Sequence, residues 1–363
     1  MRCGGAREGM HRRIVVDFGG PGSAVLSDAT GLDRLVDTAR GLAGRFNWLV
    51  VEEPWVTTDS SRVCEQGLER FYASVRASSR DEEAAPELAR VCAFSRRPAQ
   101  WGFEASSYAR LITEIAAREQ LSLVGFIGHS WGSVRLQYLS DSNAVRFEWA
   151  VLLRPFPVGR SLGSLLGDRV RIMAAESGSI RLLRRVQPSP QGRLVTRFDQ
   201  LSAIAALGYV DDDYFERVSR GVRDGSDQSR IAQLSDQMWR RPKNGAPARS
   251  LLAYFQEVCG FAGAVPHPPL AVRRLPDLVR VLHAPCGTFA KNRSVTAVVP
   301  PATCVVVGTQ DAVTPERLVR AAYGRLHVAF VTSAVRSHSS FDGLNQCLTQ
   351  IDVGSTQPVE GTP

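Results

Sequence analysis

The sequence has very little lysine and no long apolar run, and each absence excludes a class of partner. Lys243 and Lys291 are the only lysines among 44 basic residues, and the arginines are scattered without interleaved aromatic residues. Nucleic-acid-binding proteins usually gather basic residues in a patch, so despite the net charge of +8 we expect no nucleic-acid partner. No run of about 18 apolar residues is present, so we expect no membrane-spanning helix and no membrane partner.

The sequence also lacks cysteines at metal-ligand spacing, and no motif in it implies a metal or another cofactor. Among the seven cysteines, Cys64 and Cys92 flank a charged stretch that they could close as a disulfide. The polar segment 1–13 holds no apolar stretch of signal-peptide length, which favours a cytoplasmic protein with free thiols. The sequence leaves the state of the cysteines and the oligomeric state open.

Strand-like and helical segments alternate along most of the chain. Short β-branched or apolar runs predict strands at 13–18, 48–52, 121–127, 149–153, 304–307 and 328–331. Helical spacing separates them, for example at 29–42, 105–119, 315–323 and 341–351. This alternation predicts an α/β fold with a mostly parallel sheet and helices on both of its faces.

The middle of the chain breaks this alternation. From 155 to 285 the pattern is helical without a convincing strand, which predicts a helical cap inserted into a core domain formed by 1–154 and 286–353. The polar stretch 60–100 indicates loop and short helix, and the tail 354–363 is expected to be disordered.

Ser130 lies in Gly128-His129-Ser130-Trp131-Gly132, between the predicted strand 121–127 and a predicted helix. Gly-x-Ser-x-Gly alone is a weak signal, but this strand-to-helix context is the one in which it forms a nucleophile elbow. The flanking glycines allow a strained turn that lifts the serine hydroxyl clear of the sheet. We therefore predict that Ser130 is the nucleophile of an acyl-transfer reaction.

A serine nucleophile needs a base to take its proton and an acid to orient that base. In α/β-hydrolase chains these follow in the order Ser, Asp, His. Asp311 and His338 each follow a predicted strand, in this order, and complete the predicted triad with Ser130. Asp342 and Glu316 are rival acids, but both are better placed as charges at helix N-termini.

Two backbone N–H groups should form an oxyanion hole for this nucleophile. Trp131 directly follows the nucleophile and is the expected source of one. The loop Gly19-Gly20-Pro21-Gly22 follows the first predicted strand and is the expected source of the other, from Gly19 or Gly20. The alternative for this loop is an ordinary Gly-Pro turn.

Together these residues resemble the proline iminopeptidase and tripeptidyl-aminopeptidase family of α/β-hydrolases. The glycine loop is similar to that family's His-Gly-Gly-Pro-Gly, the elbow to its Gly-Gly-Ser-Trp-Gly-Ser, and 308–315 to its Gly-x-x-Asp-x-x-Thr-Pro. The resemblance runs from about 13 to 347 and implies an α/β-hydrolase fold without a cofactor. It also implies that cap carboxylates hold the substrate's free amine, for which Glu257 and then Glu216 are the candidates, although Glu257 could equally be a surface charge.

Several positions depart from the family. Phe18 replaces the histidine before the glycine loop, which gives it a place in the substrate pocket, and Glu53-Pro54-Trp55 stands where the family has Arg-Gly after an Asp. Only about a dozen residues precede the first predicted strand, so the family's two N-terminal antiparallel strands are expected to be absent.

Three functions follow from these observations. The resemblance implies an aminopeptidase that hydrolyses a small peptide or amide next to its free N-terminus. The departures favour, as an alternative, a repurposed hydrolase that cleaves or cyclises an ester, thioester or amide of a specialised metabolite. A third hypothesis is a non-catalytic, ligand-binding relative, but the complete Ser, Asp and His set argues against it.

Overall fold

The computed structural model describes residues 2–4, 12–26, 33, 36–37, 46–77, 83–94, 100–142, 145–160, 162–177, 181–190, 192–241, 248–262, 272–288 and 297–351. In these residues the main sheet has seven strands in the order β1-β3-β2-β4-β5-β8-β9. Its strands are β1 (Arg2–Gly4), β2 (Arg12–Asp17), β3 (Asn47–Val50), β4 (Ser122–His129), β5 (Trp149–Leu153), β8 (Ala302–Gly308) and β9 (Ala329–Ser333). β1 pairs antiparallel with β3, and the other neighbouring pairs are parallel.

Helices cover both faces of the sheet, because apolar side chains alternate between its two sides. On one face Phe126 and Leu152 pack with the helices α5 (Ala105–Arg118), α6 (Gly132–Asp141) and α13 (Glu316–Tyr323). On the other, Ile127 and Val151 pack with α14 (Leu344–Gln350). The prediction of a mostly parallel sheet covered on both faces is thereby confirmed.

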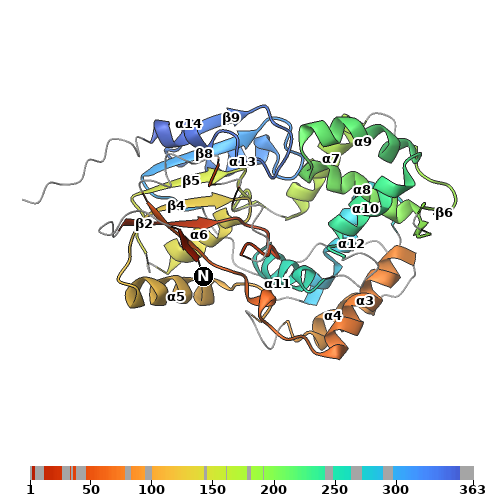
Figure 1. The fold of residues 1–363 in the computed structure, drawn as a ribbon, viewed down its shortest axis with the longest axis horizontal. Coiled ribbons are helices and arrows are strands. Elements are labelled where there is room, and N and C mark those ends of the chain that lie inside the picture. The colour runs from red at the N-terminus through yellow and green to blue at the C-terminus, as the bar shows by residue number, and fades with distance from the viewer. Residues whose placement is uncertain are drawn as a thin grey trace, which may run out of the picture.

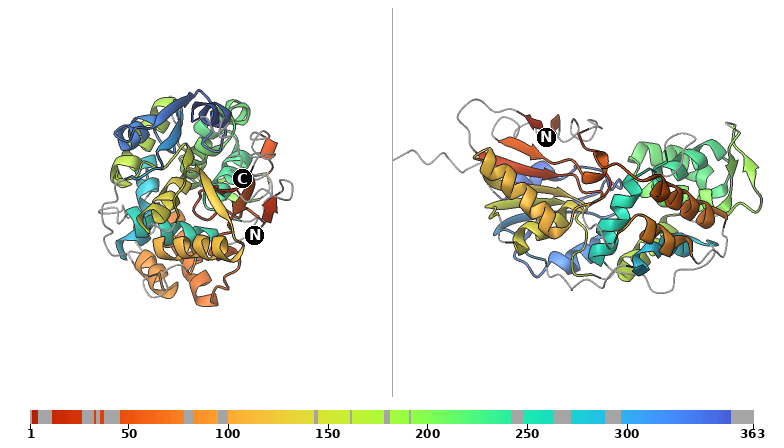
Figure 2. Two further views of the ribbon diagram at one scale, coloured as in Figure 1. Left: turned by 90° about the vertical axis from the view of Figure 1, so that its left-hand side faces the viewer. Right: turned by 90° about the horizontal axis from the view of Figure 1, so that it is seen from below.

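A group of helices that extends from one end of the sheet forms the cap (Figure 1, Figure 2). Its members from the middle of the chain are α7 (Leu162–Ser177), α8 (Arg197–Ala206), η2 (Leu207–Tyr209), α9 (Asp212–Asp224), α10 (Gln228–Met238), α11 (Ser250–Ala262), α12 (Leu275–Leu282) and η3 (Ala284–Thr288). The cap also contains two short antiparallel strands of two residues each, β6 (Gln187–Pro188) and β7 (Leu194–Val195), which the sequence did not predict.

The cap also draws on an earlier part of the chain, and here one prediction is wrong. The stretch 60–100, expected to be loop and short helix, contains the 16-residue helix α3 (Arg62–Ala77) and the helix α4 (Ala84–Val91), after a 3-10 turn η1 (Pro54–Val56). Leu68 and Phe71 of α3 belong to the same apolar cluster as Phe198 and Trp239 of the cap. Charged residues on the exposed side of α3 give it a polar composition, which conceals this buried stripe in the sequence.

Three disulfides join six of the seven cysteines: Cys64–Cys92, Cys259–Cys286 and Cys304–Cys347. The first is the pair that the sequence left open, and the other two were not predicted. The edge strand β1 also differs from the expectation that antiparallel strands are missing at the N-terminus. Most of the predicted helix 29–42 and the tail 354–363 lie outside the described residues, and the boundaries expected for core and cap stay predictions.

Candidate active site

Ser130 occupies a sharp turn between β4 and α6. Its φ is 50°, in the left-handed region that a residue with a side chain rarely adopts, as is typical of a nucleophile elbow. Glycine keeps the turn narrow, since a Cβ on Gly132 would lie 2.7 Å from the carbonyl oxygen of Asp17. The Ser130 N–H donates to the carbonyl of Leu153 at 2.9 Å, so the elbow is fixed to the end of β5.

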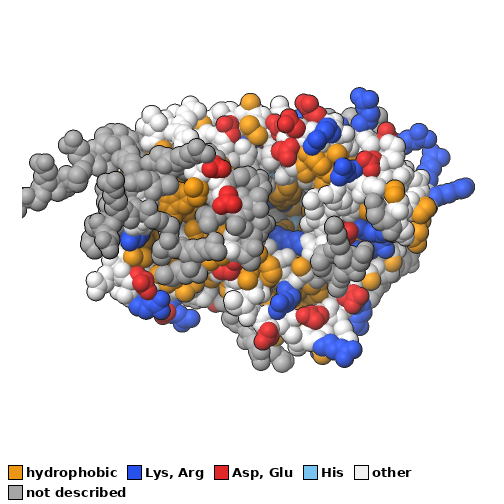
Figure 3. All heavy atoms as spheres, in the orientation of Figure 1, with side chains coloured by type: hydrophobic (Ala, Val, Ile, Leu, Met, Phe, Trp, Pro, Cys, Tyr) orange, Lys and Arg blue, Asp and Glu red, His pale blue; other side chains and the backbone are white. Residues whose placement is uncertain are grey.

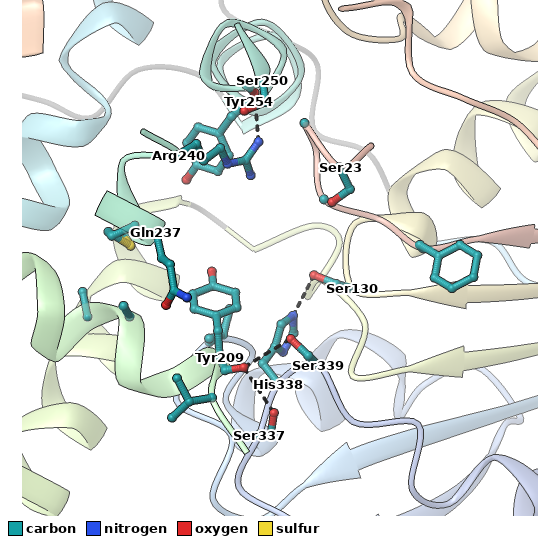
Figure 4. Close-up of a pocket in the computed structure, with 18 of the residues that line it drawn as sticks. Ser23, Ser130, Tyr209, Gln237, Arg240, Ser250, Tyr254, Ser337, His338 and Ser339 are labelled. Atoms are coloured by element: carbon teal, nitrogen blue, oxygen red, sulfur yellow. Dashed lines mark hydrogen bonds between the residues drawn. The ribbon is translucent and has the colours of Figure 1, made fainter. Parts of the chain in front are cut away.

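The three predicted triad residues lie in one hydrogen-bonded row. The Ser130 Oγ is 2.8 Å from the Nε2 of His338, as Figure 4 shows, and the Nδ1 of the same ring is 2.8 Å from the Oδ2 of Asp311. They meet because each follows the carboxyl end of a parallel strand: β4, β8 or β9. This geometry allows the imidazole to take the serine proton while the carboxylate orients the ring.

Asp311 is held in its ionised form. Burial alone would raise the pKa of its carboxyl, but His338, Arg154 and several hydrogen bonds lower that pKa to about 2. The N–H groups of Val313 and Thr314 donate to its Oδ1 at 2.8 and 3.0 Å, and the Thr314 hydroxyl donates to its Oδ2 at 3.0 Å. The fully buried guanidinium of Arg154 lies 3.6 Å from the same Oδ2.

The loop that carries the base is fixed at its own backbone. The His338 N–H donates to the carbonyl of Gly208 at 3.0 Å, and the His338 carbonyl lies 2.7 Å from the Nε2 of His129 in the elbow. Burial lowers the pKa of His129 to about 4, and the neighbouring His338 acts in the same direction. At neutral pH His129 is therefore an uncharged bridge between the nucleophile turn and the base loop.

The glycine loop lies against the elbow, and its amides have different partners. The Gly19 N–H donates to the Oδ1 of Asp17 at 2.8 Å, and the Gly22 N–H donates to the Oε2 of Glu53 at 2.5 Å. Pro21 has no N–H, and in the described part of the chain no acceptor engages the N–H of Gly20. Of the two predicted loop donors, Gly20 is therefore the one left for an oxyanion.

Gly19 has a different role, which is to let the loop approach the elbow. Its φ is 71°, and a Cβ built on it would lie 2.2 Å from the carbonyl oxygen of His129 and 2.8 Å from the amide nitrogen of Trp131. Only glycine fits such a contact. The amide of Trp131, the other predicted donor, therefore lies directly beside the glycine loop.

Behind the glycine loop, Arg135 of α6 binds three buried carboxylates, which the sequence did not predict. Its Nη1 is 3.1 Å from the Oδ1 of Asp17, and its Nη2 is 2.7 Å from the Oε1 of Glu53. The Nη2 is also 2.8 Å from the Oε1 of Glu257 on α11. We call these four side chains the Arg135 cluster. The sequence pattern of α6 does not reveal this cluster, because each of the three acids comes from a distant segment of the chain.

Each carboxylate of the Arg135 cluster also holds part of the site. Asp17 and Glu53 accept the glycine-loop amides described above, and Glu257 accepts the indole N–H of Trp131 at 2.8 Å. Burial raises the pKa of Glu257 to about 7 and raises that of Glu53, while Arg135 opposes both shifts. The cluster thus ties the two sides of the candidate oxyanion hole to each other and to the cap.

Of the three predicted substrate-binding residues, Phe18 lines the pocket, and Glu257 and Glu216 do not. Glu257 lies in the Arg135 cluster, 2 % exposed, and also accepts the N–H of Phe103 at 2.9 Å, so it does not line the pocket. Glu216 is exposed on α9 and is not among the lining residues either. Phe18 does line the pocket, where its ring meets the edge of Phe341 at 6.0 Å.

A cavity of about 850 Å³ opens above Ser130, between the carboxyl ends of the strands and the cap. Figure 3 shows the hollow near the middle of that face of the molecule, and Figure 4 shows Ser130 and His338 at its wall. Lining residues from the cap include Arg169, Met173, Tyr209, Gln237, Arg240 and Tyr254. The described residues contain no group of three or more His, Cys, Asp or Glu side chains that could hold a metal ion. They also contain no helix long and apolar enough to cross a bilayer.

No protein-family model matches this chain, and no curated protein matches it in sequence. Several solved structures are similar in chain path. Homoserine O-acetyltransferase from Staphylococcus aureus has 9% identity and a TM-score of 0.49, with 98% of this chain and 88% of that one covered. The enol-lactonase from Burkholderia xenovorans LB400 has 13% identity and a TM-score of 0.43, with 97% and 94% covered. An α/β-hydrolase fold protein from Nakamurella multipartita has 14% identity and a TM-score of 0.40, with 94% and 91% covered. At these values the likeness says nothing about the reaction.

Proposed function

We propose that this protein is a serine hydrolase that forms an acyl-enzyme on Ser130. The observation that carries the proposal is the row of two 2.8 Å hydrogen bonds from Ser130 through His338 to Asp311. In the first step Ser130 attacks a carbonyl carbon while His338 takes the hydroxyl proton and then gives it to the leaving group. In the second step His338 activates a water molecule that releases the acyl group.

The backbone supports the charge that develops during each attack. The amides of Trp131 and Gly20 are the proposed donors to the oxyanion, one from each side of the contact between elbow and glycine loop. The cluster around Arg135 fixes both sides through buried hydrogen bonds. A preformed pair of donors costs no reorganisation when the oxyanion appears, which is the main source of rate enhancement at such sites.

The residues that line the pocket favour one substrate class over the other. An aminopeptidase needs a carboxylate in the pocket to hold the free amine, and Glu257 and Glu216 lie elsewhere. Asp211 is the only carboxylate among the described lining residues, and it is exposed and already accepts the N–H of Tyr214 at 2.7 Å. We therefore favour the hydrolysis of an ester or amide without a free amine over the trimming of N-terminal residues.

A fluorophosphonate probe tests the nucleophile. We expect the probe to label wild-type protein on Ser130, and Ser130→Ala to lose both the label and all turnover of 4-nitrophenyl esters. Ser142→Ala, an exposed serine at the end of α6, is the matched control and should label like wild type. Folded wild-type protein that does not label would instead support a non-catalytic, ligand-binding protein.

A substrate panel separates the two chemistries. We expect 4-nitrophenyl esters to be cleaved and aminoacyl-4-nitroanilides with a free N-terminus to be poor substrates. Efficient turnover of proline 4-nitroanilide, abolished by Ser130→Ala, would restore the aminopeptidase hypothesis.

A further inference from the structure

Two arginines of the cap line the pocket without a carboxylate partner. Arg240 follows α10 and Arg169 lies on α7, and both are half-buried among the lining residues. Neither makes an ion pair within the described residues, although many other buried or half-buried arginines of this chain do. A guanidinium facing a cavity without a counter-ion is a candidate binder for an anionic ligand group.

Arg240 lies against the glycine loop of the proposed active site. Its Nη1 donates to the carbonyl of Ser250 at 2.9 Å and would lie 1.7 Å from a Cβ built on Gly22, so it touches the glycine loop directly. Figure 4 shows its guanidinium at the wall of the pocket that contains Ser130. The charge of Glu53 acts on Arg240, but this acid already accepts hydrogen bonds from Gly22, Trp55 and Arg135 and makes no ion pair with Arg240.

Arg169 is anchored at two points. Its Nε donates to the carbonyl of Val313 at 2.5 Å, next to the loop of Asp311, and its guanidinium also hydrogen-bonds to the hydroxyl of Tyr254. A guanidinium has five N–H groups, so donors remain for a further partner. Tyr254 links the two arginines, since its ring centre is 5.7 Å from the guanidinium carbon of Arg240 and the charge of Arg169 acts on its hydroxyl. Burial raises the pKa of Tyr254 to about 12 in spite of both arginines, so at neutral pH its hydroxyl is uncharged.

The acids of the cap do not neutralise this part of the pocket. Asp168 is paired with Arg171 and Arg317, and Asp236 with Arg193 and Arg241, outside the lining. The cap segments 242–247 and 263–271, which lie outside the described residues, contain no Asp or Glu in the sequence. Only the exposed Asp211 at the start of α9 adds negative charge to the described lining.

We propose that Arg240 and Arg169 form an anion subsite, which binds a carboxylate on the substrate while Ser130 attacks the ester or amide carbonyl. The inference rests on the proposed hydrolase function for its second half, but the subsite itself can be tested without turnover. The substrate class is then an ester or amide that carries a free carboxylate elsewhere in the molecule. A purely structural role for Arg240, as a distant counter-charge to Glu53, predicts no binding preference for anions.

Equilibrium binding tests the subsite in a Ser130→Ala background, where the ligands are not consumed. The probes are the monomethyl esters of glutaric, adipic and suberic acids, each compared with its dimethyl ester, which has the same shape but no charge. We expect at least one monomethyl ester to bind about tenfold or more tightly than its dimethyl ester, because hydrogen bonds to charged groups contribute more than neutral ones. Calorimetry at low ionic strength measures the difference, which added salt should reduce.

Variants then assign the effect to the two arginines. Arg240→Gln and Arg169→Gln should each remove most of the preference for the anion, and Arg240→Lys should keep part of it because it keeps the charge. Arg220→Gln, an exposed arginine of α9 outside the pocket, makes the same charge change and should keep the full preference. Circular dichroism melting checks that each variant is folded.

The outcomes separate this proposal from the hydrolase proposal. Equal binding of monomethyl and dimethyl esters, or a preference that survives both glutamine variants, would overturn the anion subsite even if the fluorophosphonate probe labels Ser130. Failure of the probe to label, with anion preference intact and lost in Arg240→Gln, would overturn only the hydrolase.

Discussion

The carboxylate of Asp311 lies 2.8 Å from the Nδ1 of His338 and is held there by three further donors from Val313 and Thr314. The carboxylate therefore fixes which ring nitrogen carries the proton. Asp311→Asn keeps the shape but offers an amide N–H to Nδ1, which favours the tautomer that cannot accept the serine proton. We expect kcat for an activated ester to fall by about 10³- to 10⁴-fold with little change in KM, measured by steady-state kinetics. A loss below tenfold would mean that Asp311 does not orient the base.

The pH profile of kcat/KM should separate Glu257 from the other buried groups of the site. Asp311, with a pKa of about 2, and His129, with a pKa of about 4, have both completed their titration before neutral pH is reached. Glu257, whose pKa burial raises to about 7, changes charge between about pH 5 and 8 and accepts the indole N–H of Trp131 beside the proposed oxyanion hole. The profile of Glu257→Gln should therefore differ from that of wild type in this window, whereas the profile of Asp342→Asn, which changes an exposed acid after the base loop, should be the same as that of wild type. A Glu257→Gln profile that coincides with that of wild type would show that this carboxyl does not affect the reaction.

The contact between the glycine loop and the elbow can be tested at Gly19, with Gly192 as the matched control. Their φ angles are 71° and 76°, but a Cβ on Gly192 meets nothing within 4 Å, whereas one on Gly19 would overlap His129 and Trp131. Gly192→Ala should cost about 1 kcal/mol of folding free energy, from backbone conformation alone. Gly19→Ala should cost several kcal/mol more and abolish probe labelling, as measured by urea unfolding and fluorophosphonate reaction. Similar unfolding midpoints for the two variants would show that the loop moves aside freely.

Glu257 should make stability depend on pH in a direction unusual for an acid. Burial raises its pKa to about 7 from 4.5, so between these values the folded protein holds a proton that the unfolded chain has released. The free energy of unfolding gains this contribution fully below about pH 4.5 and loses it as the pH rises through about 7. A shift of this size corresponds to a few kcal/mol, at about 1.4 kcal/mol per pKa unit.

Chemical denaturation between about pH 5 and 8 checks this prediction. Glu257→Gln cannot titrate, so the difference in unfolding free energy between wild type and this variant should shrink as the pH rises. Glu216→Gln changes an exposed acid of the cap and should run parallel to wild type. Parallel curves for Glu257→Gln and wild type would contradict the raised pKa.

The disulfides predict both a labelling pattern and a loss of stability on reduction. Since six of the seven cysteines are joined, iodoacetamide should add one label to the denatured, non-reduced chain, on Cys3, and seven after reduction. The bonds close segments of 27 to 43 residues, and such bonds typically contribute about 2 to 4 kcal/mol each. Dithiothreitol should therefore lower the melting temperature markedly. Seven labels without reduction would contradict the pairing.

Because disulfides are typical of oxidising compartments, we propose that the protein works in such a compartment and not, as the sequence had led us to expect, in the cytoplasm.

The core of the fold could be predicted because its signals are local. A buried parallel strand is a short apolar run, and all six parallel strands have one, for example β5 at its observed bounds of Trp149–Leu153. Ser130, Asp311 and His338 could be selected as candidates because chain order and position after a strand restrict the choice to few residues. The structure brings these three side chains together.

The features that the sequence did not predict depend on partners far away in the chain. Glu257 resembles a surface or pocket acid until Arg135, 122 residues earlier, is seen to bury it. The helix α3 has a polar composition, and only the cap cluster shows that Leu68 and Phe71 face a core. No pattern within one helix identifies Arg240 as a pocket residue either, since Ser250, Gly22 and Tyr254 place it there.

The Arg135 cluster has a consequence for attempts to give this protein a new specificity. Exchanging the cap for that of another hydrolase would remove Glu257 and leave Arg135 with two acids, while the indole of Trp131 would lose its acceptor. Trp131 also supplies one of the proposed oxyanion donors through its amide. A graft that keeps the triad intact would therefore still be expected to lose activity, because moving the indole would move this amide as well. A transplanted cap should carry a glutamate at the position of Glu257, or the core should be redesigned around Arg135 at the same time.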